Sequence, residues 1–307
     1  MIARRRFFRI VAGAGLLAGS AWSTGVGATG PVHRWRGTAL GASAQIILAD
    51  DRAADLMILV RAEIERLEAI FSLYRPDSVL SRLNHEGRFD RPPSELVVLL
   101  SMCDALYVRT NGYFDPTVQS LWQLYAECYA HGQSPSMIEI TNTHSLTGWP
   151  RVSVSMRSVQ LPPGMGLTLN GIAQGFISDR IADLLKSEGV GDALIDAGEI
   201  RAEGTTPNGS PWRVGIAEPG SPGRMRSYLA LSDKALATSE PMGSTFDKAG
   251  QVGHIINPRT GRPGGQWRQI SVMAPSAALA DGLSTAFCLM PQDAIKRASS
   301  GVEVLLA

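Results

Sequence analysis

Residues 167–176 read Leu167-Thr168-Leu169-Asn170-Gly171-Ile172-Ala173-Gln174-Gly175-Phe176. This pattern predicts a strand that turns through glycines into a helix. Glycine lets the backbone approach a ligand closely, and the positive end of a helix attracts anions, so such a turn can hold a phosphate. Tight packing of a strand on a helix would explain the same residues, so this turn needs support from the rest of the chain.

The hydrophobic periodicity on both sides of the turn predicts an alternation of helices and strands. An opening strand is expected at 41–48, and an apolar stripe that includes Leu56, Val60 and Leu67 predicts a long helix after it. A second helix is expected to begin at the N-cap Ser94. This second helix is expected to end by Gly112. The other expected elements are helical residues at 113–130, helices at 173–186 and 277–290, and strands at 193–196, 212–217, 228–231, 253–256, 269–274 and 302–306.

The order of these elements indicates the fold class. Residues 131–166 are rich in Ser, Thr, Pro and Gly, which predicts loops and short strands and a seam between two subdomains. Helices and strands follow no regular βαβ alternation. We therefore expect an α+β fold with mixed or antiparallel sheets.

The first 28 residues have the features of an export signal. Ala3-Arg4-Arg5-Arg6-Phe7-Phe8-Arg9 resembles the twin-arginine signal, and the apolar stretch at 10–22 is too short to span a bilayer as a helix. The small residues Val26-Gly27-Ala28 predict cleavage after Ala28. We expect a signal peptide at 1–28, a folded unit at 29–307 and a periplasmic protein exported folded by the twin-arginine machinery; an uncleaved anchor or a disordered basic tail is the alternative.

Composition argues against nucleic acid as a partner. The chain is 44% hydrophobic and 19% charged, which is ordinary for a globular protein. Four arginines and no acidic residue lie in the first 28 residues, so the remainder carries a formal charge of −3 instead of the +1 of the whole chain. No basic footprint for nucleic acid is expected.

Two further stretches carry groups suited to chemistry. Asp281 and Thr285 are four residues apart on an expected helix, so two hard oxygen ligands can point to one cation such as Mg²⁺. His254 lies at the start of an expected strand that ends in a Pro-Gly turn, and its imidazole can accept a proton near neutral pH. Taken singly, an ordinary polar pair and a structural histidine are the better explanation of these residues.

Taken together, the motifs resemble the family of FAD:protein FMN transferases. The matching stretches cover nearly all of the chain after residue 36: residues 37–41, 71–74, 78–84, 112–118, 170–175, 196–198, 237–239, 254–261 and 280–286. The wording of residues 170–175, together with the leader, is similar to the subgroup associated with nitrous-oxide reductase maturation.

The resemblance implies a two-part fold with FAD in the cleft between the parts, and it implies roles for individual residues. The metal ligands would be the main-chain carbonyl of Ala173 and the side chains of Asp281 and Thr285. His254 would lie near the pyrophosphate. The residues implied to contact FAD are Tyr74, Phe114, Asp115, Asn170, Gly171 and Gln174.

Four positions carry residues that differ from those usual in the family's motifs. Gln174 stands where lysine is frequent and Asn170 where glycine is, Glu199 follows residues 196–198 where Gly-Asn is usual, and Asn257 replaces an aspartate. Gln174 argues against a cationic side chain that grips phosphate at that position. The other departures are expected to change the FAD pocket without removing the metal ligands or the histidine.

The reaction implied by the resemblance is Mg²⁺-dependent transfer of FMN from FAD to a Ser or Thr hydroxyl, with release of AMP. His254 is the expected base for that hydroxyl. The expected acceptor is a membrane-anchored FMN-binding electron-transfer protein. Two alternatives stay open: a periplasmic FAD carrier without chemistry, and an FAD pyrophosphatase that uses water and releases FMN and AMP.

Overall fold

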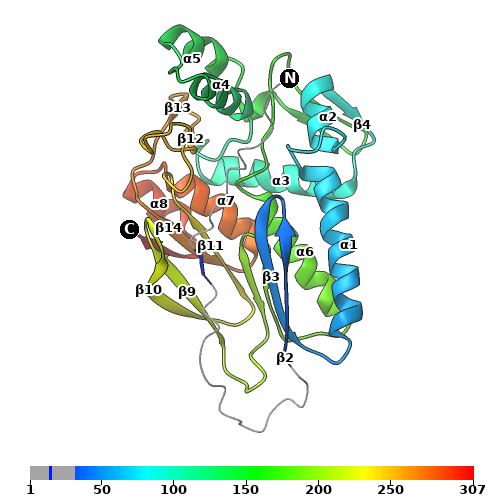
Figure 1. The fold of residues 1–307 in the computed structure, drawn as a ribbon. Helices are drawn as coiled ribbons and strands as arrows, with labels where there is room; N and C mark the ends of the chain where they lie inside the picture. The colour runs from blue at the N-terminus through cyan, green and yellow to red at the C-terminus, as the bar shows by residue number, and fades with distance from the viewer. Residues whose placement is uncertain (1–13, 16–31) are drawn as a thin grey trace.

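The computed structural model describes residues 14–15 and 32–307 (Figure 1). The predicted signal peptide and its cleavage site lie outside these residues, apart from the short strand β1 (Ala14–Gly15), which pairs with β9 (Trp212–Glu218). Within the described residues, no helix is long and apolar enough to cross a membrane.

A seven-stranded sheet forms the centre of the molecule. Every pairing between its neighbouring strands is antiparallel. In spatial order the strands are β15 (Glu303–Leu306), β14 (Ile270–Ala274), β11 (Lys234–Ser239), β8 (Ile200–Glu203), β7 (Ala193–Asp196), β3 (Ala42–Ala49) and β2 (Val32–Ala39). The expected α+β class with antiparallel strands is confirmed.

Both faces of this sheet are covered, because successive side chains of a strand point to opposite sides. On β3, Ile46 and Leu48 belong to the large core shared with the helices, whereas Ile47 packs with Trp212 and Val214. The helices of the large core that contact the sheet are α1 (Ala53–Phe71), α6 (Ala173–Ser187) and α7 (Ala277–Phe287); β9 and β10 (Ser221–Leu231) cover the other face.

The remaining elements lie mostly beyond one end of the sheet. Figure 1 shows α4 and α5 together at that end, close to the hairpin of β12 and β13. A separate small core joins α4 and α5 to residues 246 and 256. These elements are α2 (Val79–Glu86), β4 (Arg88–Asp90), α3 (Ser94–Arg109), α4 (Gln119–Ala130), α5 (Met137–His144), a 3-10 turn (Trp149–Arg151), β5 (Ser153–Val154), β6 (Ser158–Gln160), β12 (Ile256–Asn257), β13 (Arg262–Pro263) and α8 (Gln292–Ala298).

Helices α6 and α7 are in close contact at their N-terminal ends. A Cβ atom added to Gly175 would lie 2.3 Å from the carbonyl oxygen of Ala277 and 2.7 Å from the nitrogen of Ala278, so only glycine fits there. The carboxylate of Asp179 accepts hydrogen bonds from the N–H groups of Ala277 (2.7 Å) and Ala278 (2.9 Å). Helix α6 therefore satisfies two N–H groups at the start of α7, in addition to the N-cap Ser276, whose side chain accepts from the N–H of Leu279.

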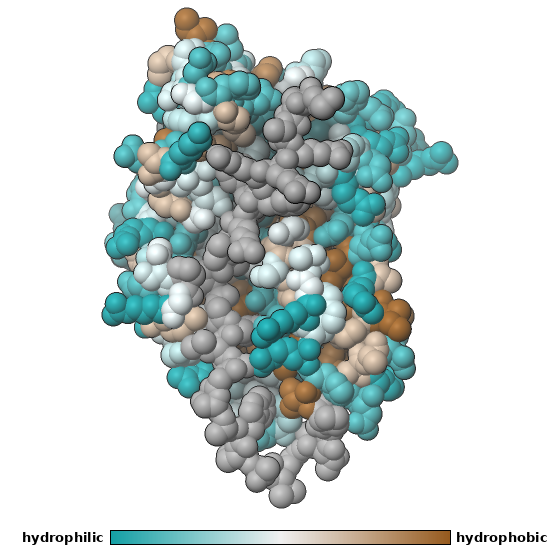
Figure 2. All heavy atoms as spheres, viewed as in Figure 1, coloured by the Kyte–Doolittle hydropathy of each residue, from teal (hydrophilic) through white to brown (hydrophobic). Residues whose placement is uncertain are grey.

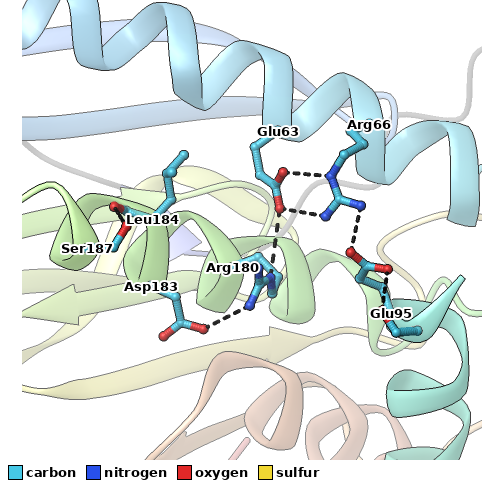
Figure 3. Close-up of polar contacts among 8 residues, drawn as sticks. Glu63, Arg66, Glu95, Arg180, Asp183, Leu184 and Ser187 are labelled. Carbon is cyan, nitrogen blue, oxygen red and sulfur yellow. Dashed lines mark hydrogen bonds and ion pairs between the residues drawn. The ribbon is translucent and has the colours of Figure 1, made fainter.

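An ionic network ties α6 to α1 and α3 (Figure 3). On α1, Arg66 contacts Glu63 of the same helix (2.8 Å) and Glu95 of α3 (2.6 Å). On α6, Arg180 lies 3.8 Å from Glu63 and 3.5 Å from Asp183 of its own helix. These side chains are partly exposed, so each pair contributes only about 0–1 kcal/mol. Burial of the apolar faces supplies most of the stability of this packing.

Apolar side chains are exposed at one tip of the molecule and also lower on the same face (Figure 2). Figure 2 shows hydrophilic residues over much of the described part of the visible face, with hydrophobic colour at the tip where Figure 1 places α5. Met137 and Ile138 on α5 are 59% and 73% exposed.

Several sequence expectations are wrong in detail. The expected strand at 253–256 is mostly a loop, since β12 begins only at Ile256, and residues 167–169 are extended but belong to no described strand. Residues 131–166 contain β5 and β6 as expected but also α5. Helix α3 begins at Ser94 itself, with Pro93 in the capping position. The other elements that were not expected are β1, β2, α2, β4, the 3-10 turn, β8, β11, β13 and α8.

Candidate functional site

Hydrogen bonds with Asn84 on α2 and with Pro116 hold the residues that lead into the glycine turn before α6. The side-chain amide of Asn84 donates to the carbonyl of Leu167 (2.8 Å) and accepts from its N–H (2.7 Å). The N–H of Thr168 donates to the carbonyl of Pro116 (2.8 Å). The turn therefore lies directly beside the segment at 113–118, which provides another wall of the same cavity.

This cavity opens where the turn, α7, β11 and the segments at 113–122 and 243–256 meet. Its volume is about 140 Å³, which is below the roughly 300–1,000 Å³ of drug-sized ligand pockets. The residues that line it are Tyr74, Tyr113, Phe114, Asp115, Pro116, Val118, Trp122, Thr168, Asn170, Gly171, Gln174, Glu199, Thr238, Ser239, Glu240, Gly243, Ser244, Thr245, Phe246, His254, Ile255, Ile256, Asp281, Thr285 and Leu289.

The expected site residues are distributed along the sequence and meet in this cavity. All of them are among its lining residues except Ala173, whose side chain is buried in the large core at the first position of α6. Its neighbour Gln174 reaches the cavity and packs against Gly198, where an added Cβ would lie 2.6 Å from the Gln174 side chain. The role of the Ala173 carbonyl stays a prediction.

Asp281 and Thr285 lie one helical turn apart on α7, as expected. The Asp281 side chain is buried, and one of its oxygens accepts a hydrogen bond from the N–H of Gly175 (3.1 Å). The hydroxyl of Thr285 lies 3.4 Å from the Ser239 hydroxyl and packs on Gly171, where a Cβ would meet it at 3.0 Å. The glycine turn and α7 thus place two oxygen ligands beside each other.

Burial makes the ionised form of Asp281 costly. Desolvation raises its pKa to about 7, and the nearby carboxylate of Asp179 acts in the same direction, whereas the hydrogen bond from Gly175 opposes the shift. Burial also raises the pKa of Asp196 to about 6. For Glu199, burial and then the charges of Asp281 and Asp196 raise the pKa well above its usual range. A divalent cation at this position would favour the ionised carboxylates.

The oxygen donors fit a hard cation such as Mg²⁺. Among the described residues, no group of three or more His, Cys, Asp and Glu side chains is arranged to hold a metal ion alone. Mg²⁺ commonly binds one or two carboxylates and takes its other ligands from water and substrate phosphate. Asp281, with the hydroxyl of Thr285 beside it, matches that requirement.

His254 lies in the loop between residue 253 and β12. Its Nδ1 is 3.1 Å from the carbonyl oxygen of Ser244. Since a carbonyl only accepts, Nδ1 carries the proton of the neutral ring and Nε2 is the acceptor. Burial lowers the His254 pKa, while the carbonyls of Ser244 and Pro241 partly offset that shift, so the ring is neutral near pH 7.

Aromatic side chains form the apolar wall of the cavity. Phe246 stands 5.4 Å from Trp122 and 5.6 Å from Tyr125 between ring centroids. Phe114 is buried, and Tyr74 is 58% exposed at the mouth. Such a wall suits a planar ring system.

Asp115 has a structural function in addition to its place in the lining. One of its oxygens accepts from the N–H (2.8 Å) and hydroxyl (2.6 Å) of Thr117, and the other accepts from the N–H of Trp149 (3.1 Å). These bonds fix the loop on which Phe114 lies. If Asp115 contacts FAD, the same carboxylate must do so while it also orders the loop.

Most of the lining residues had no assigned role in the sequence analysis, and Trp122, Ser239 and Phe246 are three of them. Trp122 falls with Tyr125 and Tyr129 on one face of α4, and this aromatic stripe is a helical signal that could have marked the wall. Ser239 lies in the matched stretch at 237–239. Phe246 follows no motif, so only the fold reveals it.

Comparison with solved structures defines the class. The fold matches an ApbE protein from Thermotoga maritima with a TM-score of 0.82, 26% identity and coverage of 90% of this chain and 94% of that one. It matches the apo flavinyl transferase ApbE from Pseudomonas stutzeri with a TM-score of 0.79, 26% identity and coverage of 90% and 91%. The architecture is thus that of the bacterial flavin transferases.

Comparison of sequences defines the family. The model of the ApbE family matches residues 40–306, and the chain belongs to this family. It is 29% identical over 249 residues to the FAD:protein FMN transferase of Vibrio cholerae, and this alignment covers 76% of this chain and 74% of that protein. It is 25% identical over 291 residues to the FAD:protein FMN transferase of Salmonella typhimurium, with coverage of 89% and 81%.

Proposed function

We propose that this protein transfers the FMN part of FAD to a Ser or Thr hydroxyl of an acceptor protein and releases AMP. The observation that carries the proposal is a single cavity in which the glycine turn, the Asp281–Thr285 pair and His254 come together in a member of the ApbE family. The relatives named above carry this activity in their names.

The chain would hold a divalent cation through the Asp281 carboxylate, the Thr285 hydroxyl and the main-chain carbonyl of Ala173. Bound Mg²⁺ would supply charge neutralisation of the pyrophosphate and of the departing AMP. Charge balance supports the proposal, because four carboxylates and no Lys or Arg line the cavity among the described residues. A cation in the cavity would lower the repulsion between a pyrophosphate and these carboxylates.

The role proposed for His254 is that of the base. The acceptor oxygen forms a bond to the phosphorus of the FMN half, the bond from that phosphorus to the oxygen of AMP breaks, and the hydroxyl proton passes to Nε2 of His254. The Nδ1–H bond to Ser244 fixes the tautomer that can accept this proton. AMP leaves with the electron pair of the broken bond.

The remaining residues would orient FAD. The aromatic wall would cover the isoalloxazine ring, with Phe114 on the loop ordered by Asp115. Asn170, Gly171 and Gln174 would place the turn against the pyrophosphate, with the N-terminal end of α6 toward the negative charge. This positioning would supply most of the rate enhancement.

The acceptor and the location of the reaction extend the proposal. We expect the acceptor to be a membrane-anchored FMN-binding electron-transfer protein in the periplasm. The leader at 1–28 supports export through the twin-arginine machinery, and a folded protein can take that route. Assignment to the nitrous-oxide reductase maturation subgroup stays a prediction.

One assay separates the proposal from its two alternatives. Purified protein is incubated with FAD, Mg²⁺ and the FMN-binding domain of a candidate acceptor. A fluorescent acceptor band on a denaturing gel supports transfer, free FMN with AMP indicates a pyrophosphatase, and unchanged FAD indicates a carrier. Asp281→Ala should abolish the band while the protein stays folded; a band of wild-type intensity would remove Asp281 from the cation site.

A further inference from the structure

Glu199 is a buried carboxylate in the cavity to which the proposed reaction assigns no role. It lies in the turn between β7 and β8, is 5% exposed and lines the cavity together with Asp281. Its main-chain carbonyl accepts a hydrogen bond from the Ser178 hydroxyl (2.6 Å). This bond helps to fix the backbone of the turn from which the side chain reaches the cavity.

Of the four lining carboxylates in the part of the chain that the structure describes, three accept a single hydrogen bond, and the one accepted by Glu199 is the longest. Asp115 accepts three hydrogen bonds, Glu240 accepts a short one from Gln269 (2.7 Å), and Asp281 accepts one from Gly175. Glu199 accepts only a long one, on one oxygen, from the N–H of Thr238 (3.3 Å). Among the described residues, its other oxygen has no hydrogen-bond donor.

A buried carboxyl group with so few donors either keeps its proton or is paired with a positive charge. No Lys or Arg side chain lines the cavity in the described part of the chain, and Asp196 and Asp281 add negative charge nearby. The group that can supply positive charge is the divalent cation proposed at Asp281. An anionic side chain close to a cation strengthens its binding even without direct ligation.

We propose that Glu199 is a second anionic anchor of the cation site, so that this protein binds its divalent cation before FAD arrives. The inference rests on the proposed function for the position of the cation. Asp281 alone would leave most of the negative charge to be supplied by the pyrophosphate. With Glu199 present, the empty cavity already offers two carboxyl groups that can ionise when the cation binds.

Mn²⁺ alone is a suitable probe, because free Mn²⁺ can be followed by electron paramagnetic resonance without FAD or turnover. Wild-type protein should bind Mn²⁺ in the absence of FAD, and Glu199→Gln should bind it about 10- to 100-fold more weakly, as typical for groups that support a metal site. With FAD present the difference should shrink, since the pyrophosphate then supplies negative charge. Glu199→Asp should keep most of the affinity.

Glu240→Gln is the matched control, because it removes one charge from the same cavity at a carboxylate paired with Gln269. Its Mn²⁺ affinity should stay close to that of the wild type. Equal Mn²⁺ affinity of Glu199→Gln and wild type, or equal losses in both variants, would overturn the inference. If Glu199→Gln does not fold, Glu199→Ala takes its place, with the same loss of Mn²⁺ affinity expected and with Glu240→Ala as its control.

FMN transfer measured on the same samples separates this inference from the proposed function. If the wild type transfers FMN and Glu199→Gln binds Mn²⁺ normally, the inference about Glu199 fails and the proposed function stands. If the wild type binds Mn²⁺ through Glu199 but transfers no FMN, the proposed function fails and the inference about Glu199 stands.

Discussion

Replacing Gly175 by alanine tests whether the contact between α6 and α7 builds the site. The new Cβ would lie 2.3 Å from the oxygen and 2.5 Å from the carbon of the Ala277 carbonyl, which are backbone atoms that cannot rotate away. The helices would have to separate. That movement would also weaken the hydrogen bond from the Gly175 N–H to Asp281.

Two opposing effects set the magnitude. Alanine favours a helix over glycine by about 0.5–1 kcal/mol, whereas overpacking of this kind costs about 1–3 kcal/mol. We therefore expect a net loss of roughly 1–2 kcal/mol in the free energy of unfolding, which lowers Tm by a few degrees in a chain of this size. Transfer of FMN by the folded fraction should fall as well, because Asp281 moves relative to the turn.

The assay is urea unfolding followed by tryptophan fluorescence, with single-turnover FMN transfer on the same preparation. Gly191→Ala is the matched control, because no atom lies within 4 Å of its added Cβ and its φ is outside the left-handed range. Its stability should change by no more than about 0.5 kcal/mol. A Gly175→Ala protein that is more stable than the wild type and transfers FMN normally would refute the reasoning.

Three further predictions concern the site and the leader. His254→Ala should bind FAD and Mg²⁺ nearly as the wild type does but lose about 10²- to 10⁴-fold in single-turnover transfer; normal transfer with intact FAD binding would exclude it as the base. The Asp281 pKa is about 7 in the folded protein and 3.8 as its ordinary value, so the folded state holds a proton that the unfolded state releases, and stability is lost as pH rises through this window. In a chelator, Asp281→Asn should therefore be more stable than the wild type at about pH 8, on the order of 1–4 kcal/mol, with the difference vanishing toward about pH 4; urea unfolding at both pH values measures it, and a difference independent of pH would contradict it. Replacing Arg4 and Arg5 by lysine should leave unprocessed precursor in the cytoplasm, and normal processing detected by immunoblot of cell fractions would contradict export by the twin-arginine route.

Periodicity predicted the elements that bury one regular face. Strand β7 was located to the residue, and α6 to within one residue, because each has a clear apolar pattern and the glycine turn marks where α6 starts. The strand β11 was missed because Ala235, Leu236 and Ala237 are buried on both faces of the sheet and show no alternation. Helix α5 was missed although Ser136 and Glu139 form its capping box, since the surrounding composition resembles a loop.

The site was predictable only as a set of separate motifs. Asp281 and Thr285 follow from helical spacing, and His254 from its motif, but nothing in their spacing states that they share one cavity. The isolation of Glu199 from donors is a property of three-dimensional packing. Its sequence position indicated only an unusual residue after 196–198.

The central sheet has a consequence for the order of assembly during synthesis. Strand β3 pairs with β7, about 150 residues later, and β11 is enclosed only when β14 pairs with it. Pairings between such distant segments form slowly, and until β14 emerges the apolar edge of β11 is open to other chains. The helix that carries Asp281 follows β14 directly. Neither FAD nor a divalent cation can therefore stabilise the growing chain, and we expect both to bind only after the last strands have been made.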